Sequence, residues 1–145
     1  MNRNDLFNYK FLKIRIDKYK EQYIEKFCAV TSVTAKIDGL PKAKNKPNYT
    51  IEEFLDSSNE LIKLFNEELE KEKEIFNQLQ KMENEKYRTV LYLRYIVYAT
   101  EQNSLEKTAL DMNYNYNDVS RWNKEALNEF DKLDKEHKKT QDNTN

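Results

Sequence analysis

Glycine and proline are scarce in this chain of 145 residues, which contains one Gly and two Pro. A β-protein needs many tight turns, and these residues are the usual means of making them. No stretch alternates apolar and polar residues for long, as a half-buried strand would. The shortage therefore argues against a β-fold and predicts an all-α protein built from long helices.

Cysteine and histidine each occur once, at Cys28 and His137. A single cysteine excludes an intrachain disulfide and a cysteine-cluster metal site. The sequence has no Glu-x-x-His pair of the kind that holds a di-metal centre in a helical bundle, and one glycine cannot supply a glycine-rich phosphate loop. We therefore expect no metal site, no cofactor and no enzymatic activity.

Long apolar runs are also missing from the sequence. No run approaches the roughly 20 residues that a membrane-spanning helix needs. The opening residues, MNRNDLF, contain no apolar segment of signal-peptide length. We therefore expect a cytoplasmic protein with no membrane partner.

Charged residues are abundant and unevenly distributed. Residues 1–49 carry 11 Lys and Arg against 5 Asp and Glu, whereas residues 50–85 carry 4 against 11. Residues 86–145 carry 10 of each sign. The basic and acidic parts could attract one another across an interface. Two solvated helix faces that differ in sign explain the pattern equally well.

Helical periodicity is what the sequence does contain. A first helix is predicted from about Asp5 to Ile37, because apolar residues recur there every three or four positions as in a coiled-coil seam. This seam consists of Tyr9, Leu12, Ile16, Tyr19, Tyr23, Val30, Val33 and Ile37, with Lys26 as its one polar member. Gly39 and Pro41 are expected to end the helix, and a basic linker follows at about 38–49.

A second amphipathic helix is predicted from Ile51 to Met82, opened by a capping box of Thr50 and Glu53. The two helices have matched lengths of roughly 45–50 Å at 1.5 Å per residue. A short linker between matched helices predicts a long antiparallel hairpin, although each seam could instead pair with a second chain. This region, 1–83, is the first predicted domain.

The second predicted domain, 84–134, begins with a helix from about Glu85 to Tyr98 that Asn84 caps. Two further helices are predicted over 104–133, on either side of a polar break at 113–117. Their apolar positions are Leu105, Thr108, Ala109, Met112, Val119, Trp122, Ala126, Leu127, Phe130 and Leu133. This is the helix-turn-helix plan, whose second helix can lie in the DNA major groove. Residues 135–145 are expected to be a disordered tail.

The polar break has the residues that such a turn requires. Ser104 is expected to cap the first helix, and Asn115 or Asn117 the second. Asn113 suits a left-handed backbone conformation, for which Asn is second only to Gly. The ring of Tyr114 is expected to lie under the turn.

Six residues in the N-terminal half of the second helix are expected to face outward: Tyr116, Asn117, Asp118, Ser120, Arg121 and Lys124. Arg121 and Lys124 could reach base edges or phosphates, and Asn117 could read adenine. Three basic residues stand against five acidic ones over 117–134. Because phosphate neutralisation dominates DNA affinity, this helix alone is expected to bind weakly. Helping cations could come from Lys86, Arg88, Arg94 and Lys107.

The segments YRTVLYLRYI and SLEKTALDMNYNYNDVSRWNKEAL resemble the C-terminal promoter-reading domain of sigma-70 family factors. They resemble more closely the small phage-encoded sigma-like regulators of Gram-positive hosts. The residues that carry the similarity are Arg94, Tyr95, Ile96, Ala109, Tyr114, Val119, Arg121, Ala126 and Leu127. Two long upstream helices joined by a Gly–Pro linker are also similar. The resemblance implies transcription activation, such as that of late phage genes.

Two functional hypotheses follow from the sequence. The first is a DNA-binding transcriptional regulator with a sigma-like helix-turn-helix, whose amphipathic hairpin mediates homodimerisation or contact with RNA polymerase. The second is a protein-interaction module or inhibitor that keeps the helix-turn-helix as a scaffold and contacts a host protein. The acidic balance of the second helix is the reason for the second hypothesis.

Overall fold

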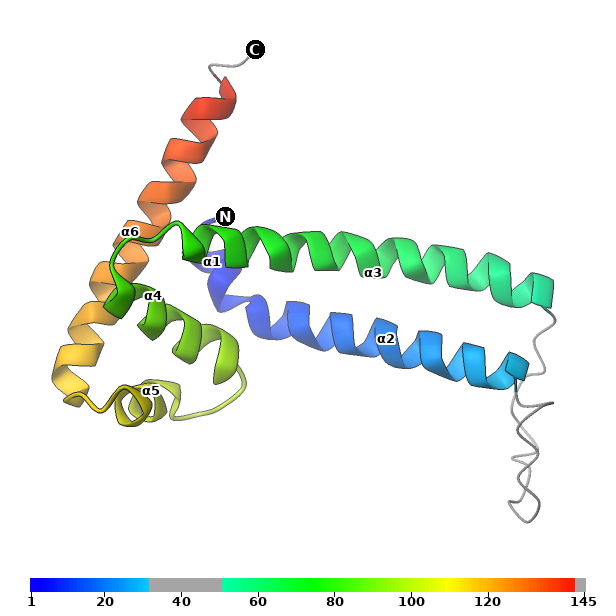
Figure 1. Cartoon of the computed structure of the whole chain (residues 1–145), viewed down its shortest axis with the longest axis horizontal. Coiled ribbons are helices and arrows are strands. Elements are labelled where there is room, and N and C mark those ends of the chain that lie inside the picture. The colour runs from blue at the N-terminus through cyan, green and yellow to red at the C-terminus, as the bar shows by residue number, and fades with distance from the viewer. Residues whose placement is uncertain (32–50, 143–145) are drawn as a thin grey trace. The chain divides into compact units, whose positions relative to one another are not determined.

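The computed structural model describes residues 1–31 and 51–142 (Figure 1). Within these ranges it contains helices and no strand, which confirms the predicted all-α class. The elements are α1 (Arg3–Phe7), α2 (Tyr9–Thr31), α3 (Ile51–Gln80), α4 (Glu85–Tyr92), the π-helix η1 (Leu93–Val97), α5 (Ser104–Met112) and α6 (Tyr116–Asp142). The predicted helix end at Ile37, the linker at 38–49 and the Thr50 cap lie outside the described residues.

The chain is divided into two compact units, unit 1 (Met1–Lys13 with Glu70–Asn145) and unit 2 (Ile14–Leu69). This division differs from the boundary predicted at 83/84. The last turns of α3 belong to unit 1 because Gln78 donates a hydrogen bond to the Phe130 carbonyl of α6 at 2.9 Å. Helices α2 and α3 each contribute residues to both units.

The N-terminal segment of unit 1 forms α1, which is separated from α2 at Asn8. Asn2 caps α1, because its side chain accepts hydrogen bonds from the backbone of Asn4 and Asp5. The Asp5 carboxylate accepts the Asn2 N–H in return at 2.8 Å, completing a capping box. The prediction of one continuous helix from Asp5 is therefore wrong. Asn8 separates the two helices, because its backbone N–H caps the carbonyls of α1 and its own carbonyl accepts the Phe11 and Leu12 N–H groups at the start of α2.

Helix α4 begins where predicted, because the Asn84 side chain accepts hydrogen bonds from the backbone N–H groups of Lys86 and Tyr87. The α-helix does not reach Tyr98 as predicted. The chain passes instead into η1, in which the Tyr98 N–H bonds to the Leu93 carbonyl at 2.8 Å. A π-turn places one extra residue in the helical turn, and apolar periodicity does not reveal it.

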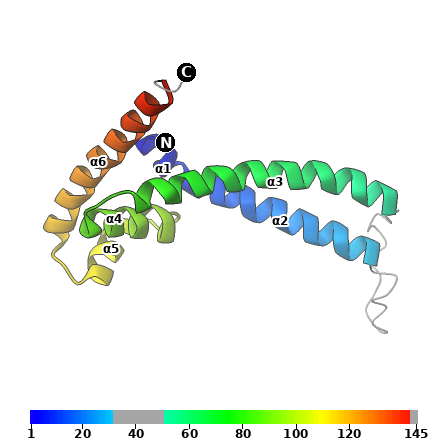
Figure 2. The same cartoon turned by 45° about the horizontal axis from the view of Figure 1, so that its top comes forward.

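The core of unit 1 forms where α4, α5 and α6 meet (Figures 1 and 2). Val90, Ala109 and Val119 are buried there, one from each helix. The partly buried side chains around them are Leu105, Met112 and Trp122. Farther along α6, Phe130 is completely buried. The small Ala109 side chain lets α5 approach its neighbouring helices closely.

Helix α6 continues to Asp142, so the prediction of a disordered tail is wrong for residues 135–142. Side chains one turn apart interact along this segment: Lys138 pairs with Asp134 at 3.1 Å, and Gln141 lies 3.0 Å from the His137 ring. Such pairs each stabilise a helix by about 0.2–0.5 kcal/mol. Lys139 in the last turn also complements the helix dipole. These stabilising features do not depend on an apolar face.

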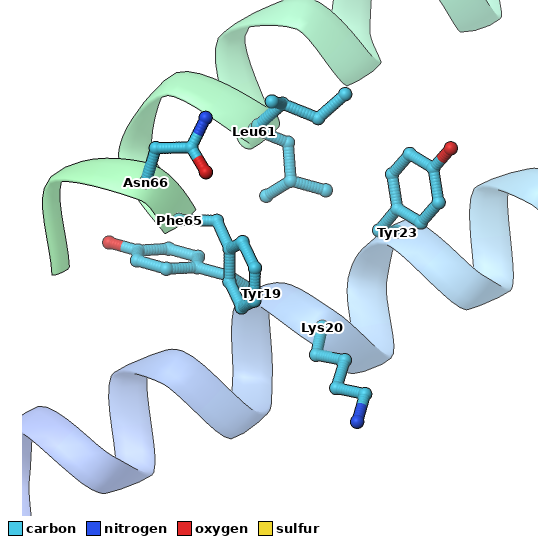
Figure 3. A pocket seen from close by; sticks show the side chains of 7 residues that line it. Tyr19, Lys20, Tyr23, Leu61, Phe65 and Asn66 are labelled. Atoms are coloured by element: carbon cyan, nitrogen blue, oxygen red, sulfur yellow. The ribbon is translucent and has the colours of Figure 1, made fainter. Parts of the chain in front are cut away.

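In unit 2, α2 and α3 lie side by side with their contacts in antiparallel order (Figures 1 and 2). Arg15 forms an ion pair with Glu68 at 3.3 Å. Farther along α2, the rings of Tyr23 and Phe27 lie 6.0 and 6.3 Å from the ring of Phe54. The apolar side chains that this pair buries within the described part of unit 2 are Ile16 and Leu61, each 6% exposed, and Leu61 also lines a groove between the two helices (Figure 3).

Candidate nucleic-acid interface

The connection between α5 and α6 contains the left-handed residue that the sequence predicts. Asn113 has φ 59° and ψ 42°, and its backbone N–H caps the carbonyls at the end of α5. The next N–H, that of Tyr114, bonds back to the Ala109 carbonyl at 3.1 Å. This hydrogen bond closes the turn, as is common where a helix ends at a left-handed residue.

The two predicted caps have different outcomes. Asn115 caps α6 as predicted, because its side-chain oxygen accepts the Asn117 N–H at 2.9 Å. Ser104 does not cap α5, because it is already the first helical residue and Asn103 occupies the cap position. The backbone carbonyl of Ser104 instead accepts the Thr108 hydroxyl at 2.7 Å.

The six predicted contact residues all lie on the first three turns of α6, but they do not form a single face. Asn117, Arg121 and Lys124 are exposed and lie within about 60° of arc on the helix, given 100° per residue. Tyr116 and Ser120 lie along one edge of this face. Asp118 lies along the other edge. We call Asn117, Arg121 and Lys124 the outer face of α6.

Arg121 is the most prominent cation of the outer face, with 64% of its side chain exposed. Its guanidinium lies 3.7 Å from the Asp118 carboxylate, one turn earlier. An exposed pair of this kind contributes about 0.3–0.5 kcal/mol at most. Because the pair is weak, a phosphate or a base can replace Asp118 as the partner of Arg121 at little energetic cost.

Lys86 of α4 adds a further positive charge beside α6. Its ammonium lies 4.8 Å from the ring centroid of Trp122 and 5.3 Å from that of Tyr114. The two rings pack edge to face, 4.9 Å apart, so the Tyr114 ring lies against α6. The aromatic pair holds Lys86, which stays exposed, next to the first turns of α6.

Tyr87 connects α4 to α6 through a hydrogen bond from its hydroxyl to the Glu125 carboxylate. This hydrogen bond raises the pKa of Tyr87 above its ordinary value. In the same way, a hydrogen bond to Asp111 raises the pKa of Tyr98 and connects the end of η1 to α5. Both tyrosines are therefore neutral donors to carboxylates at physiological pH.

The N-terminal segment of the chain contacts two carboxylates in the second half of α6. Arg3 bonds to the Asp131 carboxylate through its backbone N–H at 2.8 Å and through its Nε at 2.5 Å. The Met1 amino group donates to Asp134 at 2.6 Å. This hydrogen bond, opposed in part by burial, lowers the pKa of Asp134 below its ordinary value. The negative charges that argue against DNA binding are thus partly neutralised within unit 1.

The other cations considered from the sequence make intramolecular contacts. Lys107 pairs with Glu101 at 2.8 Å. The Arg94 guanidinium lies over the Tyr95 ring at 5.1 Å, and Arg88 donates to the Met82 carbonyl at 3.5 Å. Of the four candidate helpers, Lys86 is the one that the structure places against a side chain of α6.

Sequence reasoning missed the contacts that reach across long stretches of chain. The pairs Arg3–Asp131 and Met1–Asp134 join residues more than 120 positions apart, and no local pattern indicates them. It also missed Asn123, which is buried on the inner face of α6. Within the described ranges, the Asn123 side-chain oxygen has no hydrogen-bond partner.

Residues 1–31 and 51–142 contain no group of His, Cys, Asp or Glu side chains arranged to hold a metal ion. In those same ranges no helix is both long enough and apolar enough to cross a membrane. No protein-family model, curated protein or solved structure matches this chain.

Proposed function

We propose that the protein is a cytoplasmic DNA-binding transcriptional regulator in which α5 and α6 act as a sigma-like helix-turn-helix. The observation that carries the proposal is the exposed outer face, Asn117, Arg121 and Lys124, presented at the start of α6. That helix begins directly after a turn built on a left-handed Asn113. A helix that packs on a small domain through one face and exposes polar groups near its N-terminus suits the major groove.

In this proposal the functional group of each residue on the outer face determines what it contacts. Arg121 reads guanine through two donors, and Asn117 reads adenine through its amide. Lys124 and Lys86 neutralise phosphates on either side of the groove. The N-terminal end of α6 adds the partial positive charge of its helix dipole.

The acidic residues of α6 weaken this proposal less than their number suggests. Asp131 and Asp134 hold the N-terminal segment, and the Glu125 carboxylate accepts a hydrogen bond from Tyr87. The outer face at the beginning of α6 is therefore more basic than the helix as a whole. Because phosphate contacts are local, the charge of this face matters more than the net charge of the helix.

Fluorescence anisotropy with a pool of duplex fragments at low salt tests the proposal. Arg121→Ala should weaken binding about 5- to 150-fold, equivalent to about 1–3 kcal/mol for a base contact. Lys139→Ala is the matched control, because it removes an exposed positive charge about 27 Å farther along α6. Equal losses for the two variants would indicate only a net-charge effect and would contradict the proposed reading face.

A protein-interaction role is the second candidate, and exposed apolar residues near the turn favour it. Leu110 on α5 is 79% exposed, and Tyr114 and Tyr116 are each nearly half exposed. Here the expected result is no duplex binding at low salt, together with retention of RNA polymerase or another host protein. Leu110→Glu should then abolish that retention, whereas Arg121→Ala should leave it intact.

A further inference from the structure

Arg121 of the outer face has two carboxylates within one turn of it along α6. Asp118 lies three positions earlier, and its carboxylate is 3.7 Å from the Arg121 guanidinium. Glu125 lies four positions later, at a spacing where side chains of opposite charge pair on a helix surface. An ion pair with Glu125 would compete with DNA for the donors of the guanidinium. The availability of Arg121 therefore depends on where the Glu125 carboxylate lies.

The Glu125 carboxylate is bound by a side chain of α4. It accepts a hydrogen bond from the Tyr87 hydroxyl. The residues one turn from Glu125 on α6, in either direction, are Arg121, Trp122, Asn128 and Glu129. Only Arg121 among them is a cation. If Tyr87 released the Glu125 side chain, Arg121 would be its nearest cationic neighbour along this helix.

Tyr87 is held in place by the first two turns of α4. Its backbone N–H donates to the side-chain oxygen of the Asn84 cap at 3.3 Å. Val90 and Leu91, one turn later, are completely buried. Because residues one turn apart share a helix face, Tyr87 lies on the side of α4 that packs against its neighbours in unit 1. The cap and the buried turn thus present the hydroxyl at a defined place beside α6.

The pKa of Tyr87 reports the charges around this hydroxyl. The hydrogen bond to Glu125 is the main cause of the raised pKa, whereas the positive charge of Arg121 acts in the opposite direction. The guanidinium is therefore close enough to the Tyr87–Glu125 pair for its charge to be felt there. A rotation of the Glu125 side chain, without any movement of α6, would bring the carboxylate toward Arg121.

We propose that Tyr87 is a positioning residue of the outer face, whose hydroxyl holds Glu125 away from Arg121 and so keeps the guanidinium available to DNA. The inference rests on the proposed function, because this availability matters only if the outer face binds DNA. With Glu125 held by Tyr87, Arg121 keeps the exposed Asp118 contact. That contact is weak enough for DNA to displace.

Fluorescence anisotropy of duplex binding in a double-mutant cycle tests the proposal. Tyr87→Phe keeps the ring and the net charge, and it should weaken binding about twofold at low salt, because one exposed ion pair then competes with DNA. In a Glu125→Gln background the same substitution should have no effect, since no carboxylate remains to compete. Tyr98→Phe is the matched control, because it removes the equivalent hydroxyl–carboxylate hydrogen bond to Asp111 at the junction of η1 and α5. This variant should bind DNA like the wild type.

NMR of the full-length protein without DNA tests the same contact independently. The Arg121 Nε–H signal should respond more strongly to Glu125→Gln in a Tyr87→Phe background than in the wild-type background, because only there does the carboxylate pair with the guanidinium. Equal responses in the two backgrounds would overturn the proposal, whatever the DNA result.

Two binding results would also overturn it. One is an equal loss of affinity on Tyr87→Phe with and without Glu125→Gln, which would indicate a general weakening of unit 1. The other is a loss for Tyr98→Phe that equals the loss for Tyr87→Phe. A wild-type protein that binds no duplex would contradict the proposed function, and the Arg121 signal would then decide alone whether Tyr87 holds Glu125 away from Arg121.

Discussion

Apolar side chains recur at the same three-and-four spacing in both units, but among the described residues the completely buried ones all belong to unit 1. Val90, Val119 and Phe130 in unit 1 are completely inaccessible to solvent, whereas Ile51 and Leu55 in unit 2 are more than half exposed. The difference arises from the number of neighbouring helices. Three helices converge in unit 1 and cover one another's apolar faces. Two helices in unit 2 can cover only one seam each.

This contrast shows that periodicity predicts which residues seek a core, but not whether the chain itself supplies the rest of that core. Unit 1 supplies its own core, so its exposed side chains can contact another molecule. Unit 2 retains exposed apolar side chains on α3, among them Ile51 and Leu55. Matched substitutions in the two units test this difference in burial.

The largest effect is expected from identical substitutions at leucines in the two units. Leu91→Ala removes a completely buried side chain in unit 1 and should lower the free energy of unfolding by about 2–5 kcal/mol. Leu64→Ala in unit 2, where the side chain is 38% exposed, should cost less than about 1 kcal/mol. Urea denaturation followed by circular dichroism gives both values. Equal losses in the free energy of unfolding would contradict the difference in burial between the two units.

A smaller loss is expected at Asp134, which fastens the N-terminal segment to α6 in unit 1. Asp134→Asn removes a charge-assisted hydrogen bond from the Met1 amino group and should cost about 2 kcal/mol at pH 7. Asp142→Asn, near the exposed end of α6, is the control and should change little. Urea denaturation at a single pH distinguishes the two variants.

The same contact makes a pH prediction with a definite sign. The pKa of Asp134 is lower in the folded protein than its ordinary value of 3.8. Its contribution is therefore present above pH 3.8 and is lost as the pH falls through the folded-state pKa. The wild-type protein should progressively lose its advantage over Asp134→Asn as the pH falls below 3.8. An advantage that does not shrink as the pH is lowered would show that the carboxylate charge is not responsible.

A third substitution tests the turn that positions α6. Asn113→Ala should destabilise the protein by about 1 kcal/mol, because alanine is disfavoured in the left-handed conformation. Asn113→Gly should be neutral or stabilising, because glycine adopts that conformation readily. Thermal unfolding of the two variants measures the difference. Equal stabilities would mean that the residue does not need its positive φ in solution.

The elements of unit 1 were largely predictable because their signals are local. Asn84 and Asn115 are capping residues at the starts of α4 and α6, and the apolar spacing locates the buried face of α6. The left-handed Asn113 could be inferred because so few residue types tolerate that conformation. Local chemistry therefore fixes where these helices begin and which way they face.

The sequence could not reveal features that depend on distant partners or lack an apolar signature. The segment 135–142 is helical through charge pairs and propensity alone, so its polarity suggested disorder. The break at Asn8 and the π-helix at 93–97 leave no mark in the apolar periodicity. The neutralisation of Asp131 by Arg3 likewise joins the two ends of the chain. The sequence therefore predicted the cations Arg121 and Lys124, but not the contacts that neutralise the carboxylates farther along α6.

Whether the outer face of α6 binds DNA is decided by the salt dependence of duplex binding. The logarithm of the association constant should fall linearly with the logarithm of salt concentration in the wild-type protein. In Arg121→Ala/Lys124→Ala that slope should become shallower by about 0.9 for each phosphate contact removed, whereas Lys139→Ala should keep the wild-type slope. Duplex binding that is undetectable at low salt, or a double variant with an unchanged slope, would contradict the account.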